Sequence, residues 1–547
     1  MDAPAPATMS RRDASILLAV LGAGVFLSGL ELMITAVALP SILRDLSDIT
    51  DLRHAAWIVT GYLFVSVVTM PLAGRLADLW GVRRLFLGGL LAFTIGSGLA
   101  GLAPTLDLLI AARLVQGVGG GILVPVGTAA AAHLFDGDRR ARALGVIGGL
   151  TFLGMAAGPF VGAAILASLH PATAMEAIGV TGGPLFHALD PAWRWVFYVD
   201  VPIGLVALAF GWAASGGWDT PRRASRVDLR GALLFSVALG AGLLALSLLG
   251  SSDAVIGGLQ PAPAAAALAV LSAITGLAYL RAARSTADPF LDPRLFRDRV
   301  FASAAIVSLL TGYAFATAIV GGALFVDRVL YGGPDDQRLV LGALALATAA
   351  GALGSGWLLQ RASARAVSLI GLVLAAGALV AMSRWDPTVT LDAVAIAVAV
   401  FGLGFGLTVT PRSTAAIRSV AVHAYGVASS TVTVARMIGM AIGLAVLAAY
   451  GSTVIAHLYD QVYRTPDGYK AFIPADLRGR SLKDGLVVGA LESWAAGEAS
   501  SVMVGLFVVA AGVTVAAVPA ALVLGREVTG LGVPAAADGG PEMIPPI

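Results

Sequence analysis

The sequence predicts an all-α, polytopic membrane protein with fourteen transmembrane helices. Of its 547 residues, 58% are apolar and only 12% are charged, whereas soluble domains carry about 25% charged residues. The apolar residues gather in fourteen runs, and a helix needs about 20 apolar residues to cross a bilayer. The arginines between these runs are unevenly distributed. These three observations exclude a water-soluble globular domain and indicate a chain that crosses a membrane repeatedly.

The apolar runs follow one another along most of the chain. The first is too long for the core of a signal peptide and lacks a suitably placed small-residue cleavage site, so we expect it to be retained as a helix. The spans are expected near residues 15–40, 55–77, 85–103, 108–133, 143–168, 194–214, 231–250, 264–283, 301–326, 339–359, 366–383, 392–411, 426–457 and 499–524.

An even number of spans places both termini on one side of the membrane, and the arginines predict which side. Loops on the side of the N-terminus hold 22 arginines, Arg412 and Arg418 among them, and the opposite short loops hold six. The long segment 458–498 is left out because long loops do not follow the positive-inside rule. Both termini are therefore predicted to be cytoplasmic.

The polar residues give no sign of a cofactor, metal or nucleic-acid site. There are no cysteines, the only lysines are Lys470 and Lys483, and the six histidines lack ligand spacing. Neither lysine lies in a phosphate-binding loop, and no run of charges resembles a nucleic-acid patch. We therefore expect a protein that is not an enzyme.

A short charged turn, residues 74–84, separates the second and third spans. Its glycines provide close approach and turn freedom, and its aspartate lies where the earlier helix ends. It resembles motif A of the major facilitator superfamily of transporters. Apolar residues, Leu79 and Val82, stand where that family usually has arginine. The matching residues that we expect to act in conformational change are Gly74, Asp78, Gly81, Arg83 and Arg84.

A second, weaker copy of this turn follows the tenth span. It runs from Gly356 to Arg365, with Gln360 in the place of the aspartate. Paired copies indicate an internal repeat, which is common in transporter folds. We therefore expect two six-helix bundles, spans one to six and nine to fourteen, with spans seven and eight inserted between them. The fourteen-helix drug:proton antiporters of the superfamily are built in this way.

Four further stretches resemble that branch of the superfamily. Residues 30–40 are similar to its helix-one signature, with Glu31 in place of aspartate, and residues 113–119 resemble motif B. Residues 193–204 resemble the start of its helix six. The fifth span matches motif C, which is characteristic of antiporters, at Gly154, Gly158, Pro159 and Gly162.

Glu31 lies in the middle of the first span, where an ionised carboxylate is costly. Burial favours its neutral form, and contact with water or an arginine favours its charged form. Such alternation is what a proton-coupled carrier requires, and the resemblance implies that the family uses this position. A glutamate that only fixes the packing of a neighbouring helix is the alternative.

Arg113 and Arg436 are the arginines that we expect well inside spans. A permanently charged guanidinium there must face protein or a water-filled cavity and find a partner. The resemblance to motif B implies a role for Arg113 in proton movement, with structural pairing as the alternative. For Arg436, a substrate or proton pathway and helix-to-helix pairing are equally supported.

Motif C and Asp78 are expected to hold helices together. Glycines four residues apart lie on one helix face and permit close approach, and the resemblance implies that this packing seals the cavity in one state. It also implies that Asp78 approaches the start of span thirteen near Tyr425, where a negative charge gains about 0.3 to 1 kcal/mol from the helix dipole. A solvated loop acid is the alternative.

Spans thirteen and fourteen are longer than a membrane requires. No proline interrupts residues 426–462, and residues 485–524 also exceed the apolar layer. Together with residues 416–420 and 434–443, these lengths resemble the mycobacterial triacylglyceride and lipoglycan exporters, in which the same helices are thought to shelter lipid. That resemblance implies a periplasmic lipid carrier as a partner. A folded periplasmic cap unrelated to the substrate is the alternative.

These features predict a proton-coupled antiporter of the inner (plasma) membrane that exports hydrophobic or amphipathic molecules by alternating access, as multidrug efflux proteins do. Export of triacylglyceride or glycolipid is the alternative, and a membrane enzyme or a receptor is less favoured. The expected organisation is a cytoplasmic N-terminus (1–14), a first bundle (15–214), a linker with two inserted helices (215–300), a second bundle (301–524) that includes a periplasmic segment (458–498), and a disordered cytoplasmic tail (525–547).

Overall fold

The computed structural model describes residues 11–46, 57–176, 182–214, 218, 228–248, 261–286, 289, 291–459, 468–481 and 484–525. Within these ranges every regular element is a helix, and fourteen helices are long and apolar enough to cross a membrane. The prediction of an all-α protein with fourteen spans is confirmed. Residues 1–10 of the predicted N-terminal segment and, apart from Gly525, the predicted tail lie outside the described residues.

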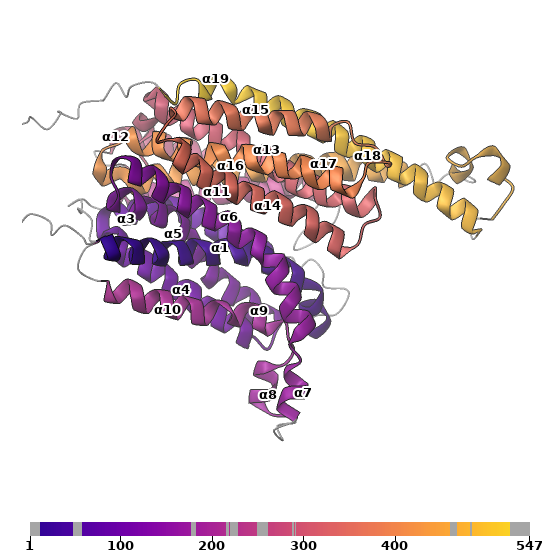
Figure 1. The fold of residues 1–547 in the computed structure, drawn as a ribbon, viewed down its shortest axis with the longest axis horizontal. Coiled ribbons are helices and arrows are strands. Elements are labelled where there is room, and N and C mark those ends of the chain that lie inside the picture. The colour runs from indigo at the N-terminus through magenta and orange to yellow at the C-terminus, as the bar shows by residue number, and fades with distance from the viewer. Residues whose placement is uncertain are drawn as a thin grey trace, which may run out of the picture.

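The first half of the chain forms one group of packed helices, coloured indigo to purple in Figure 1. Within it α1 packs on α6, and α5 packs on both α3 and α4. Two short helices, α7 and α8, project from the connection between α6 and α9 (Figure 1). The helices are α1 (Arg11–Leu46), α3 (Trp57–Trp80), α4 (Val82–Leu102), α5 (Leu106–Leu134), α6 (Gly137–Ser168), α7 (Pro171–Glu176), α8 (Pro184–Leu189), α9 (Arg194–Tyr198) and α10 (Asp200–Ala213).

The second half forms a similar group, in which α14 packs on α16, α13 on α17 and α15 on α16. Several of its helices begin at a residue whose side chain accepts a hydrogen bond from the first helical turn, as N-caps do. Asp298 does so for α13 and Thr390 for α16. The elements are η3 (Pro293–Arg297), α13 (Arg299–Arg328), α14 (Pro334–Leu358), α15 (Ala364–Met382), α16 (Leu391–Arg418), η4 (Val422–Ala424), α17 (Tyr425–Tyr459), η6 (Gly468–Ala471), η7 (Ala475–Leu477), α18 (Gly485–Ala516) and α19 (Val518–Ala521).

The two groups meet through two equivalent helix pairs, α3 with α17 and α14 with α6. Each pair joins the second span of one group to the fifth span of the other. Gly74 of α3 lies against Gly426 and Ser430 of α17, and Gly356 of α14 lies against Ala141 of α6. The two copies of the charged turn therefore occupy corresponding places, at one end of the molecule that we call the Asp78 end.

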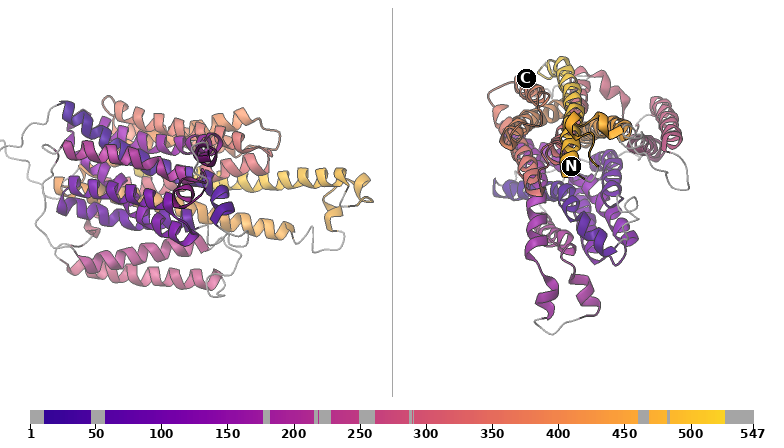
Figure 2. Two further views of the ribbon diagram at one scale, coloured as in Figure 1. Left: turned by 90° about the horizontal axis from the view of Figure 1, so that it is seen from below. Right: turned by 90° about the vertical axis from the view of Figure 1, so that its right-hand side faces the viewer.

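The inserted spans α11 (Leu229–Leu248) and α12 (Pro261–Ser285) form a pair at the edge of the molecule (Figure 2). They pack mainly on each other, and α11 also contacts α3 and α17. The Tyr279 hydroxyl of α12 both donates to the carbonyl and accepts from the amide of Leu291, which ties the pair to the segment before α13.

Helices α17 and α18 extend beyond the other spans, at the end opposite the Asp78 end (Figures 1 and 2). They contain 35 and 32 residues, so each is about 50 Å long against a hydrocarbon core of about 30 Å. Between them Tyr469, Ile473 and Leu477 bury against Val487 of α18. The described part of segment 458–498 therefore includes a small apolar cluster of its own.

Candidate functional site

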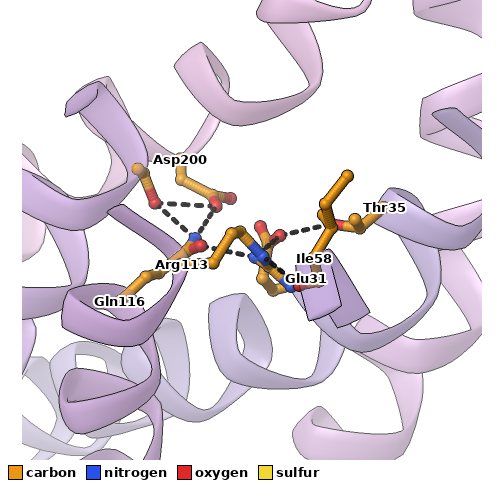
Figure 3. Close-up of polar contacts among 7 residues, drawn as sticks. Glu31, Thr35, Ile58, Arg113, Gln116 and Asp200 are labelled. Atoms are coloured by element: carbon orange, nitrogen blue, oxygen red, sulfur yellow. Dashed lines mark hydrogen bonds and ion pairs between the residues drawn. The ribbon is translucent and has the colours of Figure 1, made fainter. Parts of the chain in front are cut away.

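The centre of the candidate site is an ion pair between Glu31 of α1 and Arg113 of α5 (Figure 3). Both side chains are buried, with exposed fractions of 0% and 1%. The same carboxylate oxygen accepts a hydrogen bond from the Thr35 hydroxyl at 2.5 Å, and the Arg113 Nε donates to the Ile58 carbonyl at 3.0 Å. The first and second spans are therefore joined through one guanidinium.

A second carboxylate, Asp200, completes the network (Figure 3). Arg113 donates to the Oε1 of Gln116, and the Nε2 of Gln116 donates to the Ser97 hydroxyl at 2.7 Å and to Asp200 Oδ2 at 3.5 Å. Ser97 in turn donates to Asp200 Oδ2 at 3.2 Å. Asp200 is fully buried at the start of α10 and lies within electrostatic range of Glu31. One polar network thus links α1, α3, α4, α5 and α10.

This cluster contains one more carboxylate than guanidinium. When Glu31 and Asp200 are both ionised, a charge of −1 is left in an apolar environment, which is costly. One oxygen of each carboxylate, Oε2 of Glu31 and Oδ1 of Asp200, is buried without a hydrogen-bond partner. A single proton on either carboxyl group would neutralise the cluster. The arrangement can therefore hold and release one proton.

Two aromatic rings flank the guanidinium of Arg113. The Arg113 guanidinium lies 4.4 Å from the centre of the Tyr62 ring and 5.6 Å from that of Phe197. Cation–π contacts of this kind are stronger when both groups are shielded from water. They stabilise the guanidinium without adding negative charge, so they leave the excess of carboxylate unchanged.

The motif C glycines bring α6 against the helix that carries Glu31. A Cβ on Gly158 would lie 2.7 Å from the Met33 Cβ and 2.9 Å from the Ile34 nitrogen, and one on Gly154 would lie 2.9 Å from the Leu30 nitrogen. Contacts this short leave no room for a side chain. The close packing of α6 on the part of α1 around Glu31 therefore requires glycine at these positions. Gly162 lies on the same face of α6 and contacts Ile34.

Asp78 joins the two halves at the Asp78 end. Its Oδ1 accepts from the Gly426 amide at 2.7 Å, and its Oδ2 accepts from the Val427 amide at 2.9 Å. Because α17 begins at Tyr425, the carboxylate occupies the positive end of that helix dipole. The side chain is only 3% exposed. Gly81, with φ of 91°, makes the turn between α3 and α4 directly after it.

The motif A arginines follow Gly81 along the chain, at the start of α4. Arg83 is half-buried and Arg84 is exposed, both in the first turn of α4. Neither belongs to the Glu31 network.

Arg436 does not join the Glu31 network either. It lies in α17, in the second half, where its guanidinium is 5.6 Å from the centre of the Phe152 ring. A third arginine lies close by, and here the sequence-based expectation was wrong. Arg412, expected in a cytoplasmic loop, is 2% exposed inside α16 and donates to the Thr311 hydroxyl at 2.6 Å. The reason is that α16 continues to Arg418, past Pro411.

No group of three or more histidine, aspartate or glutamate residues in the described ranges is placed to hold a metal ion.

Comparison with known proteins now assigns the chain to a family. The model of the Major Facilitator Superfamily matches residues 21–444. The chain belongs to the Major Facilitator Superfamily. Its relatives include a triacylglyceride transporter of Mycolicibacterium hassiacum, 32% identical over 453 residues that cover 81% of this chain and 80% of the relative. Multidrug resistance protein 3 of Bacillus subtilis is 26% identical, with 83% of each chain covered.

Solved structures show the same fold. The human organic anion transporter MFSD10 superposes with a TM-score of 0.57 at 16% identity, covering 92% of this chain and 99% of its own. A bacterial homologue of the human lysosomal transporter Spinster, in an inward-facing conformation, gives a TM-score of 0.55 at 18% identity, covering 95% and 100%. At these identities the likeness concerns the fold alone.

Sequence reasoning missed three participants in the polar core of this transporter. Asp200 and Gln116 lay inside stretches that were matched to the family, yet neither was proposed as a site residue. An acid within the apolar run 195–214 was the available signal for Asp200. Arg412 was missed because it follows a proline that was taken as the end of its span.

Proposed function

We propose that this chain is a proton-coupled antiporter of the plasma membrane that exports hydrophobic or amphipathic molecules by alternating access. The observation that carries the proposal is the buried Glu31–Arg113–Asp200 cluster, whose excess carboxylate is neutralised by one proton. Protonation weakens the attraction of Glu31 for Arg113, and water or substrate that reaches the cluster reverses the change. The protonation state of Glu31 is thereby coupled to the position of the helices that surround it.

The Asp78 contact supports alternating access. It closes one end of the molecule with two charge-assisted hydrogen bonds between the halves, and the Ser429 hydroxyl donates to the Pro125 carbonyl at 2.7 Å nearby. Each such bond is worth about 1.5 to 3 kcal/mol. The free energy that couples two sites of a protein is of similar size, about 1 to 3 kcal/mol, so a conformational change driven by binding can break these bonds. The arginine-rich loops at this end support a cytoplasmic location for it and for both termini.

The coupling is tested by replacing Glu31 with glutamine, which keeps an oxygen for Arg113 and Thr35 but cannot ionise. Purified protein in proteoliposomes is supplied with ethidium or an NBD-labelled triacylglyceride, and internal pyranine reports proton movement. We expect E31Q to lower probe-driven proton flux at least about tenfold. D107N, an exposed acid on the same helix as Arg113, is the matched control and should behave as the parent protein.

Unchanged proton flux in E31Q would remove Glu31 from the mechanism. If the parent protein moves neither probe with a gradient in either direction, export of ethidium and of triacylglyceride is refuted.

Export of lipid is the second candidate, and a specific feature favours it. Two apolar cavities lie between the inserted pair and α17, with volumes of about 350 and 520 Å³. The larger is lined in part by Leu280, Phe296 and Ile306, which are exposed at the outer surface of the molecule. Volumes of 300 to 1,000 Å³ suit ligands of drug or lipid-chain size. The relatives named triacylglyceride transporters give further support.

The extended α17 and α18 fit the same candidate. They would carry a lipid away from the membrane surface toward a periplasmic lipid carrier. Movement of the NBD-labelled triacylglyceride but not ethidium would select lipid export, and the converse result would select multidrug efflux.

A further inference from the structure

Arg412 and Arg436 line a small cavity that lies between the two halves. The cavity has a volume of about 40 Å³ and is lined by α5 and α6 of the first half and by α13, α16 and α17 of the second. The side chains are 2% and 8% exposed. Arg436 follows Gly426 by ten residues on α17, which places the cavity about 15 Å inside the Asp78 end.

Neither guanidinium has an acidic partner in the described part of the chain. No carboxylate of a described residue forms an ion pair with either, and the charged neighbour of Arg412 is Arg436 itself. Arg412 contacts the Thr311 hydroxyl and lies 5.2 Å from the centre of the Phe405 ring. The hydroxyl of Ser308, which lines the same cavity, is buried without a hydrogen-bond partner. Two like charges and an unused hydrogen-bonding group thus line one small cavity.

Such an arrangement is costly in the absence of a ligand. Each buried ion loses its hydration, and the two positive charges repel each other. An anion between them would reverse the sign of the interaction and satisfy the Ser308 hydroxyl. Guanidinium groups match the planar, bidentate geometry of carboxylate and phosphate oxygens. The cavity therefore has the donors, the charge and the space of an anion site.

The surroundings indicate what the anion is attached to. The cavity wall is otherwise largely apolar, with Val124, Leu144 and Ile147 on the first-half side. On the side away from the Asp78 end, Phe152 packs between the halves against Phe315 and Phe405. A volume near 40 Å³ accommodates only a few atoms, since about 10 to 15 Å³ of such space holds one water molecule. A charged headgroup fits there, and an attached chain would lie along the aromatic contact as the halves part.

We propose that Arg412 and Arg436 form the binding site for the anionic headgroup, carboxylate or phosphate, of an amphipathic substrate. The inference rests on the proposed transport function and narrows its substrate class. Uncharged lipids would lack the group that these arginines recognise.

The test is binding of tritiated oleate to the purified full chain in neutral detergent, followed by scintillation proximity. Oleyl alcohol, with the same chain and no charge, and inorganic phosphate, with charge and no chain, serve as competitors. We expect R412Q and R436Q to weaken oleate binding about tenfold to a hundredfold, the range for one lost charge-assisted hydrogen bond. R418Q, an exposed arginine on the same helix as Arg412, should bind as the parent does.

Oleyl alcohol should compete at least about tenfold less well than oleate. Equal competition by the alcohol, or undiminished oleate binding in both glutamine variants, would overturn the proposal. Phosphate that competes as strongly as oleate would identify a site for a free anion and would overturn the proposal that the ligand is amphipathic. Monodisperse elution and a cooperative thermal transition establish folding, and R412K, which keeps the charge but loses the planar fork, carries the test if R412Q fails to fold.

The two proposals fail separately. E31Q should bind oleate as the parent does, because Glu31 lies outside this cavity. Unchanged proton flux in E31Q, with arginine-dependent oleate binding, would refute the proposed coupling alone. Lowered proton flux in E31Q, with oleate binding that does not depend on the arginines, would refute the present inference alone.

Discussion

Asp78→Asn should open the Asp78 end of the transporter. The carboxylate accepts one hydrogen bond on each oxygen, from the Gly426 and Val427 amides at 2.7 and 2.9 Å. Asparagine keeps one acceptor and presents an NH₂ group to the other amide. The variant therefore loses one charge-assisted bond, about 1.5 to 3 kcal/mol, and the favourable interaction with the dipole of α17, about 0.3 to 1 kcal/mol.

Under the proposed alternating access this contact forms only when the halves are closed, so its loss shifts the closed-to-open ratio by about twentyfold to several hundredfold. The chain contains no cysteine, so a spin-label pair at R142C and R418C, both exposed, needs no other substitution. Pulsed electron paramagnetic resonance should show that a longer distance between the two spin labels gains population in D78N. D136N, an exposed acid at the start of α6, is the control. Identical distance distributions in D78N and the parent would show that the bond does not hold this end closed.

Two further predictions concern stability. Gly158→Val should lower the melting temperature, because the new Cβ would lie 2.7 Å from the Met33 Cβ, and overpacking of this kind costs about 1 to 3 kcal/mol. Gly354→Ala is the control, since nothing lies within 4 Å of the added Cβ. Its free energy of unfolding should stay the same or rise by up to about 1 kcal/mol. A G158V protein that melts with the parent would mean that α1 and α6 can separate freely. Hydrogen bonds from the Leu486 amide and Arg480 lower the pKa of Asp484, so its contribution is present above about pH 3.9 and is lost as the pH falls through the lower folded value. Hydrogen exchange at the start of α18, corrected for intrinsic rates, should therefore accelerate on acidification in the parent, whereas D484A, which has no side-chain acceptor for the Leu486 amide, should exchange fast at every pH.

Local patterns were sufficient to predict the spans and the two halves of this transporter. Each span must satisfy its own backbone hydrogen bonds inside the membrane, so a run of about 20 apolar residues predicts a helix without knowledge of its neighbours. The two copies of the charged turn, after α3 and α14, predicted the repeat. Each copy is a short stretch of sequence, so it can be recognised without knowledge of the rest of the fold. The limit of this reasoning is Arg412, where a proline did not end α16.

The sequence alone also determined that Glu31 and Arg113 are buried charges, because both fall well inside apolar runs. Their pairing, the addition of Asp200 from a helix 84 residues beyond Gln116, and the meeting of Arg412 with Arg436 were decided only by the tertiary structure. The physical reason is that a helix direction and a depth in the membrane follow from local sequence, whereas the face that a helix turns toward its neighbours follows from packing among all of them. The charge balance of each cluster, and hence what it can bind, depends on that packing.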